Sequence, residues 1–169
     1  MNDKTLVNQE FRSTIEDLEK SFEKSPDVIK VEIDTQHHYA HGVYSREVLI
    51  PKGCTLTGKI HRHSCINVIT KGKITVETEN GQKLITAPAV LISPPGTKRA
   101  GYAHSDTIWM TFHHTEQTNH ELIEQEVIAK SYYDYENEPD PVFPPAGLNK
   151  IEEETLQHLL AKKRRGISK

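Results

Sequence analysis

The stretch GKIHRHSCIN, residues 58–67, holds the side chains best suited to chemistry. His61 and His63 stand one residue apart, and Asn67 follows four residues after the second histidine. On an extended strand, side chains at i and i+2 point the same way, so we expect both imidazoles to share one face and to reach one ion or ligand. The same parity places Thr55, Thr57 and Lys59 on this polar face and Leu56 and Ile60 on the opposite, apolar face.

Two structures fit such a two-faced strand. In the first, the polar face is solvated and the histidines are ordinary surface residues. In the second, the polar face lines a barrel cavity and the histidines converge on a ligand or a metal ion. The spacing of two histidines does not by itself choose between them.

The elements around this stretch predict an antiparallel β-structure. Between residues 28 and 115, short runs rich in Val, Ile and Thr alternate with turn signals, and no helical run separates them. The runs are VIKVEI, VYSREVLI, CTLTGKIHRH, INVIT, KITVETE, KLIT, AVLIS and TIWMTFH. Asn80-Gly81 between two runs predicts a type I′ hairpin, in which both central residues have positive φ. This pattern predicts a sandwich or a closed, or nearly closed, barrel over residues 40–115.

Helical segments are predicted on both sides of the β-region. Phe11, Ile15, Leu18 and Phe22 recur at helical spacing, so a helix over 9–24 is expected within an N-terminal segment of residues 1–27. After the barrel of residues 28–115, a C-terminal helical arm is expected over 116–169. Capping boxes at Thr118–Glu121 and Asn149–Glu152 predict two helices in this arm. The helices over 9–24 and 119–129 are expected to pack their apolar faces outside the barrel or on a partner chain. The run Lys162–Arg165 is interpreted as a charged helix end rather than a nucleic-acid patch.

The composition bounds the class of protein. The chain has 169 residues, of which 35% are hydrophobic and 27% charged, so a globular domain with a real core is expected. A formal net charge of −3 makes a nucleic-acid partner an unfavoured hypothesis. No apolar run approaches the roughly 20 residues of a membrane span, and the N-terminus lacks a signal-like stretch, so a cytoplasmic protein is expected. Cys54 and Cys65 form no CxxC pair and are expected to be free thiols.

The stretch GKIHRHSCINVITKGKITV resembles the first motif of the cupin superfamily, in which a strand carries HxH, then a glutamate, then a glycine. His61, His63 and Gly72 take these places, and Asn67 stands at the glutamate position. LISPPGTKRAGYAH resembles the second motif, with Arg99 where the family has a histidine. The resemblance covers roughly residues 44–113 and extends to small, uncharacterised cupin-like proteins, some of them phage-encoded. It implies a mainly β fold, a single RmlC-like jelly-roll barrel with flanking helices, and commonly a homodimer.

The resemblance also implies a candidate metal site, which this sequence alters. A typical cupin holds a divalent metal with three histidines and a carboxylate. An arginine cannot ligate a metal, and an amide is a neutral replacement for the glutamate. An ion such as Fe, Mn, Ni or Zn at His61 and His63 would therefore need a further ligand, for which His104 is the first candidate and His113 another.

The same residues can instead form an anion pocket. His61, His63, Lys98 and Arg99 would make the cavity positive, and Asn67 would orient a ligand by hydrogen bonds. In TIWMTFHH, alternation puts Ile108, Met110 and Phe112 on one face and Thr107, Trp109, Thr111 and His113 on the other. If this second face lines the cavity, Trp109 offers a flat surface to the ligand; the alternative is a tryptophan of the core or of an interface.

Two hypotheses about function follow, and the sequence leaves both open. The first is a non-catalytic protein that senses or sequesters a small polar, anionic molecule in the barrel. The second is a metal-dependent or acid–base enzyme of the isomerase, lyase or dioxygenase type, acting on a small metabolite through His61 and His63. The missing glutamate and third histidine favour the first, and the high content of ten histidines favours the second.

Overall fold

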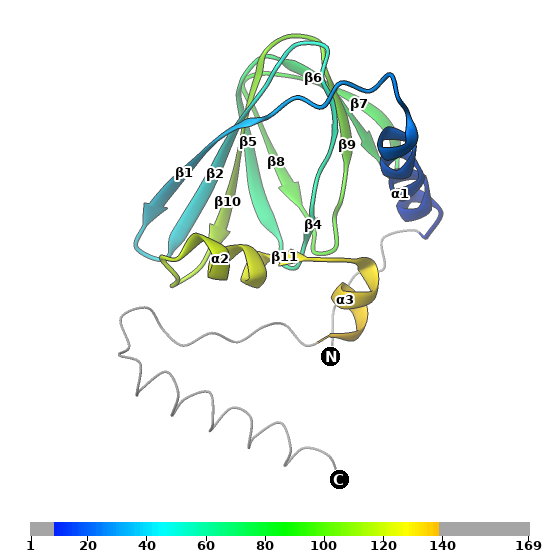
Figure 1. Ribbon diagram of the computed structural model, residues 1–169. Coiled ribbons are helices and arrows are strands. Elements are labelled where there is room, and N and C mark those ends of the chain that lie inside the picture. Colours follow the sequence, from blue (N-terminus) through cyan, green and yellow to red (C-terminus); the bar gives the residue numbers. More distant parts are fainter. Residues whose placement is uncertain (1–8, 139–169) are drawn as a thin grey trace.

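A computed structural model describes residues 9–138 of the chain. Two antiparallel sheets face each other and form a flared barrel, with one helix beside it and two short helices across one end (Figure 1). The strands are β1 (Asp34–Ala40), β2 (Val43–Ile50), β3 (Thr55–Thr57), β4 (Ile60–His61), β5 (Cys65–Lys71), β6 (Lys73–Thr78), β7 (Gly81–Thr86), β8 (Ala89–Ser93), β9 (Ala100–Ala103), β10 (Thr107–His114) and β11 (Ile128–Ala129). The helices are α1 (Gln9–Lys24), α2 (His120–Val127) and α3 (Tyr132–Asn137).

The strand order is that of a jelly roll. One sheet has the order β1-β2-β10-β5-β8, the facing sheet has the order β3-β9-β6-β7, and a short third sheet pairs β11 with β4. From β2 to β10 the chain crosses repeatedly between the two large sheets, and β6 and β7 form a hairpin within one of them. No helix separates strands within residues 34–114. The predicted mainly β, antiparallel jelly-roll fold with flanking helices is therefore confirmed.

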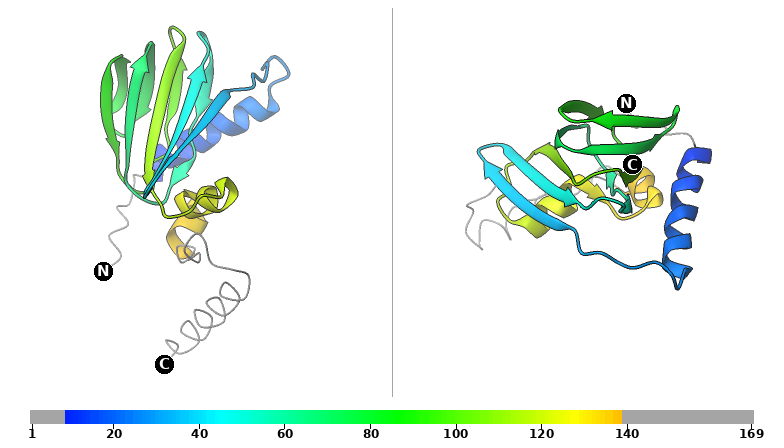
Figure 2. Two further views of the ribbon diagram at one scale, coloured as in Figure 1. Left: turned by 90° about the vertical axis from the view of Figure 1, so that its left-hand side faces the viewer. Right: turned by 90° about the horizontal axis from the view of Figure 1, so that it is seen from above.

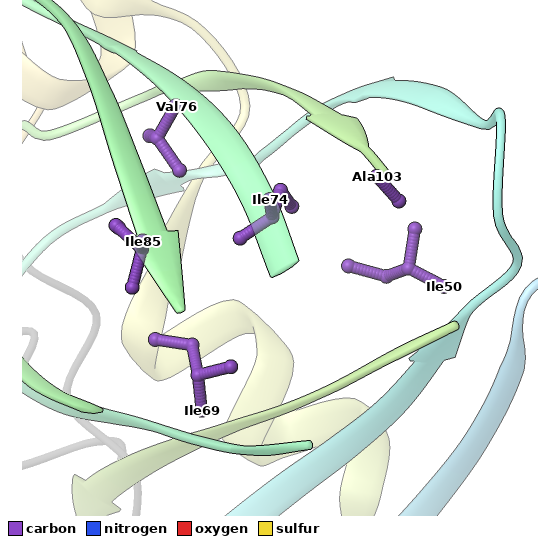
Figure 3. Packing of buried hydrophobic residues seen from close by; sticks show 6 residues of the cluster. All are labelled: Ile50, Ile69, Ile74, Val76, Ile85 and Ala103. Carbon is purple, nitrogen blue, oxygen red and sulfur yellow. The ribbon is translucent and has the colours of Figure 1, made fainter. Parts of the chain in front are cut away.

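A compact apolar cluster lies between the facing sheets of the barrel. Its buried members are Ile50, Ile69, Ile74, Val76, Ile85 and Ala103 (Figure 3). They come from both large sheets, so each sheet buries the inward half of its alternating side chains against the other. Trp109 and Leu56, both partly buried, pack against this cluster and extend it toward the polar part of the interior.

The end segments close the barrel. Ile123 and Val127 of α2 bury their side chains against Tyr44 of β2. β11 then pairs with β4, and α3 follows it across the same end of the barrel (Figure 1). α2 begins at an N-cap formed by Asn119, whose side chain accepts a hydrogen bond from the Leu122 N–H, one residue later than the predicted capping box.

Helix α1 lies beside the barrel, as the two turned views show (Figure 2). Ile15 is 1% exposed and Arg12 is 6% exposed, so the face of the helix that contacts the rest of the protein carries a buried cation as well as apolar residues. Arg12 pairs with Glu136 of α3 and stacks over the Tyr132 ring, with 4.2 Å between the guanidinium carbon and the ring centroid. Glu19 binds Lys98 at 2.6 Å.

The structure corrects three local predictions. VIKVEI is not a strand, because the first strand, β1, begins only at Asp34, directly after this run. Pairing with β2 along the whole of β1 overrides its polar composition. The hairpin near Asn80 turns at Glu79 and Asn80, and only Gly81 has positive φ, so it is not a type I′ turn. Finally, Tyr132–Asn137 forms a helix that the sequence did not predict.

The parity prediction for residues 55–63 also fails. β3 belongs to one of the large sheets, whereas β4 pairs with β11, so the chain changes partners at Gly58 and Lys59. Leu56 lines the interior while Ile60 packs against Ala129, Tyr132 and Tyr135. β4 ends at His61, and His63 lies in the exposed bend that follows. The i, i+2 rule requires one continuous strand, which is absent here.

Candidate functional site

A cavity of about 100 Å³ lies between the two sheets. Its apolar part is formed by residues that include Val48, Ile50, Leu56, Ile74 and Val76. Its polar part is formed by Arg46, Lys59, His61, Asn67, Ser93, Thr97, Arg99 and Thr111, with Trp109 beside them. A single water molecule needs roughly 10–15 Å³ of such a volume, so the cavity suits a ligand of a few heavy atoms.

Asn67 is the centre of a fixed hydrogen-bond network in the cavity. Its Oδ1 accepts from the Trp109 indole Nε1–H at 2.9 Å and from the Thr111 hydroxyl at 3.1 Å. Its Nδ2 donates to Ser93 Oγ at 2.9 Å. Because an indole N–H can only donate, it fixes which end of the amide faces Trp109. The amide is 3% exposed, so this network holds Trp109 and Ser93 in place rather than leaving Asn67 open to a ligand.

Two guanidinium groups face this cavity. Arg99 donates to Ser93 Oγ, and burial lowers the pKa of Arg99, although an arginine stays charged at neutral pH. Arg46 comes from β2 and lines the same cavity. Within residues 9–138, no carboxylate lies within ion-pair distance of Arg46 or Arg99, and no Asp or Glu lines the cavity. The lining cation Lys59 pairs with Glu124 of α2.

His61 lies beside two further metal-binding side chains, Cys65 and His113. The His61 and His113 rings are stacked, with centroids 5.1 Å apart and planes at 14°. One candidate ligand atom from each of His61, Cys65 and His113 lies within 4.8 Å of the other two. Burial lowers the pKa of His61 to about 3, helped by the charges of His113 and Arg46, and burial lowers the pKa of His113 to about 4. Both imidazoles are therefore neutral at pH 7.

The predicted site residues divide into two groups. His61, Asn67, Arg99 and Trp109 come together in the cavity lining. Three others do not join them: His63 is exposed after β4, Lys98 pairs with Glu19 of α1, and His104 is exposed with Nε2 2.7 Å from the Thr75 hydroxyl. Lys98 instead lines a second hollow, together with Phe11, Glu79 and Arg99.

Sequence reasoning missed several cavity residues. Arg46 shares its parity on β2 with Val48 and Ile50, and that alternation could have indicated an inward-facing cation. Ser93 directly precedes the two prolines of the second motif and carried no separate signal. Cys65 was interpreted only as a free thiol, which the structure bears out, and its nearness to His113 depends on pairing between β5 and β10.

The metal set implied by the cupin resemblance does not fit this cavity. Asn67 has its amide oxygen engaged by two donors, Arg99 is a cation, and His63 lies in the exposed bend. Of the four positions, only His61 can offer a ligand atom in the interior. A histidine-and-carboxylate site built on these four positions is therefore not supported.

Comparisons with known proteins find likeness only among solved structures. No family model and no curated protein matches the chain. An RmlC-like cupin from Shewanella frigidimarina NCIMB 400 is 20% identical, with a TM-score of 0.41 over 49% of this chain and 82% of that one. A cupin superfamily protein from Desulfitobacterium hafniense DCB-2 is 10% identical, with a TM-score of 0.43 over 52% of this chain and 84% of the other.

KdgF from a Halomonas species is 18% identical, with a TM-score of 0.42 over 50% of this chain and 83% of that protein. The proteins from Shewanella and Desulfitobacterium are cupins by name, the superfamily that the two sequence motifs resemble. Likeness at these TM-scores supports no inference about ligand or chemistry, which must come from the residues of this chain. Within the described part of the chain, no helix is long and apolar enough to cross a membrane.

Proposed function

We propose that the barrel cavity binds a small anionic molecule, a carboxylate or a phosphate, in order to sense or sequester it rather than to transform it. One observation carries this proposal: Arg46 and Arg99 line a cavity to which the described chain contributes no carboxylate. Buried or half-buried charges are normally paired, since an unpaired charge loses its hydration without compensation. An anionic ligand would supply the missing partner.

The geometry also favours a compact ligand. A guanidinium presents donors in a flat fork that matches a carboxylate or phosphate. The Trp109 ring is fixed by its hydrogen bond to Asn67, so it offers a rigid apolar surface beside the charged groups. The volume of about 100 Å³ suits a small organic acid or inorganic phosphate better than a nucleotide.

The alternative, an acid–base or metal-dependent enzyme, has weaker support. A general base works best with a pKa near the working pH, whereas burial lowers the pKa of His61 to about 3 and that of His113 to about 4. Carboxylates, the other common acid–base groups, are missing from the described lining. The observation that favours a metal-dependent enzyme is the close grouping of His61, Cys65 and His113, whose side chains could hold a metal ion.

Binding of defined anions tests the proposal. Thermal unfolding and calorimetric titration would be run with inorganic phosphate and a set of small mono- and dicarboxylates. We expect at least one of these to bind, and Arg99→Gln to weaken it by at least about 30-fold, which corresponds to about 2 kcal/mol. Lys98→Gln is the matched control, because it removes the same charge from the neighbouring residue, which points to Glu19.

The control should change the affinity by less than about threefold. Equal losses in Arg99→Gln and Lys98→Gln would mean that only the net charge matters, and the cavity would not be the site. Absence of binding by every anion in the set, to wild-type protein stripped of small molecules by refolding, would refute the proposal.

A further inference from the structure

A cluster of one thiol and two imidazoles lies beside the anion cavity, and its ligand set differs from that implied by the sequence motifs. His61 ends β4, Cys65 begins β5, and His113 lies near the end of β10. His61 and Cys65 are four residues apart, whereas His113 is distant in sequence and comes beside them through pairing between β5 and β10. We propose that His61, Cys65 and His113 form a binding site for a transition-metal ion that prefers sulfur and imidazole ligands, such as Zn²⁺.

The distances suit such an ion. One potential ligand atom from each residue lies within 4.8 Å of the other two. The ligands of a tetrahedral zinc ion, with bonds of about 2.0–2.3 Å, stand roughly 3.3–3.6 Å apart. These separations would have to shorten by about 1.5 Å at most for the three side chains to close on one ion.

A buried polar atom without a partner points to the same site. His61 Nδ1 is buried and has no hydrogen-bond partner within the described residues. Buried polar atoms in native proteins are nearly always paired, because an unpaired one loses its bond to water without replacement. A coordinated ion near this imidazole would provide that missing partner.

The surroundings of Cys65 support a metal-bound thiolate. Asn67 Nδ2 lies 3.7 Å from Cys65 Sγ, within hydrogen-bond range for sulfur, and so donates toward the atom that would carry the negative charge. Such a donor beyond the ligands is a regular feature of metal sites, where it orients the ligand and stabilises its charge. Asn67 itself is fixed by Trp109 and Ser93, so this donor is held in place.

The charges nearby restrict which ion can bind. Arg46 and Arg99 act on His61 as positive neighbours, and Arg46 acts on His113, which opposes any cation. A thiolate ligand offsets one positive charge, whereas Mg²⁺ and Ca²⁺ require several oxygen ligands, and the described cavity lining offers no carboxylate. The site is therefore expected to take Zn²⁺ or Co²⁺ and to ignore Mg²⁺ and Ca²⁺. Three protein ligands leave one coordination position open.

Cobalt titration of the full chain tests this site, because Co²⁺ bound by a thiolate gives a near-ultraviolet charge-transfer band that histidine-only sites lack. We expect wild-type protein, freed of metal with a chelator, to develop this band with about one equivalent of Co²⁺ and to lose it on addition of Zn²⁺. Cys65→Ser should remove the band. Cys54→Ser is the matched control, since Cys54 is the other free thiol and lies outside the cluster, and it should keep the band.

Two further variants separate a lost ligand from a lost fold. His113→Gln keeps both thiols and should weaken Zn²⁺ binding in a competition titration by at least about tenfold. Even the loss of a residue that only hydrogen-bonds to a metal ligand typically lowers metal affinity about tenfold or more. His104→Gln should leave it unchanged. Far-ultraviolet circular dichroism checks that each variant is folded. The site is refuted if the wild-type protein shows no thiolate band, if the band persists in Cys65→Ser, or if Cys54→Ser loses it.

Discussion

Gly96 should be a position where even an added methyl group disturbs both the fold and the site. Its φ is +77°, in the region that side-chain-bearing residues rarely adopt. A Cβ built there would lie 2.8 Å from Cε1 and 3.0 Å from Cζ of Tyr135 in α3. Tyr135 is fully buried, so it has little room to move aside. Gly96→Ala therefore carries a backbone cost and a packing cost together.

The two costs can be separated by a matched control. Gly53 has a similar φ of +82° but nothing within 4 Å of an added Cβ, so Gly53→Ala should show the backbone cost alone, about 1–2 kcal/mol. Gly96→Ala should add about 1–3 kcal/mol for overpacking, giving about 2–5 kcal/mol in all. Urea unfolding at one temperature measures both free energies of unfolding.

A double-mutant cycle assigns the extra cost to its cause. Tyr135→Leu removes the ring that the new methyl group would meet, so Gly96→Ala should cost less in that background than in the wild-type protein. Because Gly96 lies three residues before Arg99, the clash should also shift that guanidinium and weaken anion binding, which Gly53→Ala should leave intact. Equal destabilisation by Gly96→Ala and Gly53→Ala, within about 0.5 kcal/mol, would refute this reasoning about the α3 contact.

Three other changes have expected outcomes. Asn67→Leu leaves the Trp109 N–H buried without its acceptor and should lower the free energy of unfolding by about 1–3 kcal/mol, measured by urea unfolding; an unchanged stability would mean that the network is not formed. Arg62 holds the pKa of the Asp134 carboxyl below its usual range, so this carboxylate stabilises the fold above its unfolded pKa and loses that effect as pH falls through the folded pKa. Asp134→Asn should thus destabilise the protein at neutral pH, by about 3 kcal/mol at most, with the gap to wild type closing on acidification; a gap independent of pH contradicts the assignment. His63→Ala should leave anion affinity unchanged in calorimetric titration, because this histidine is exposed outside the cavity. A loss of affinity of more than about tenfold would show that His63 does contribute to the site.

Much of the fold could be predicted because alternation and turn residues are local signals. The β-region, the helix over α1 and the inward face of β10 each depend on spacing within a single element. Prediction from the sequence fails where the position of a residue depends on which other strand its own strand pairs with. The break at Gly58 separates Leu56 from Ile60 because β3 and β4 pair with different strands. No periodicity within the stretch could reveal that change of partner.

The candidate site shows the same division. Asn67, Arg99 and His61 could be predicted from the motifs, and all three line one cavity. His63 could not be placed, because its position depends on where β4 ends. Cys65 and His113 come together only through pairing between distant strands.

The second capping box and the basic run at 162–165 lie outside the described residues, while a homodimer and a cytoplasmic location stay predictions.

The central claim, that a small anion binds between Arg46 and Arg99, is tested most directly by the one tryptophan of the chain. Trp109 lines the cavity, so its indole N–H gives a single nuclear magnetic resonance signal that reports on the site alone. Titration with inorganic phosphate or a small carboxylate should shift this signal saturably in the wild-type protein and in Lys98→Gln, but not in Arg46→Gln or Arg99→Gln. A bound anion that moves surface amides while the Trp109 signal stays fixed would contradict the account.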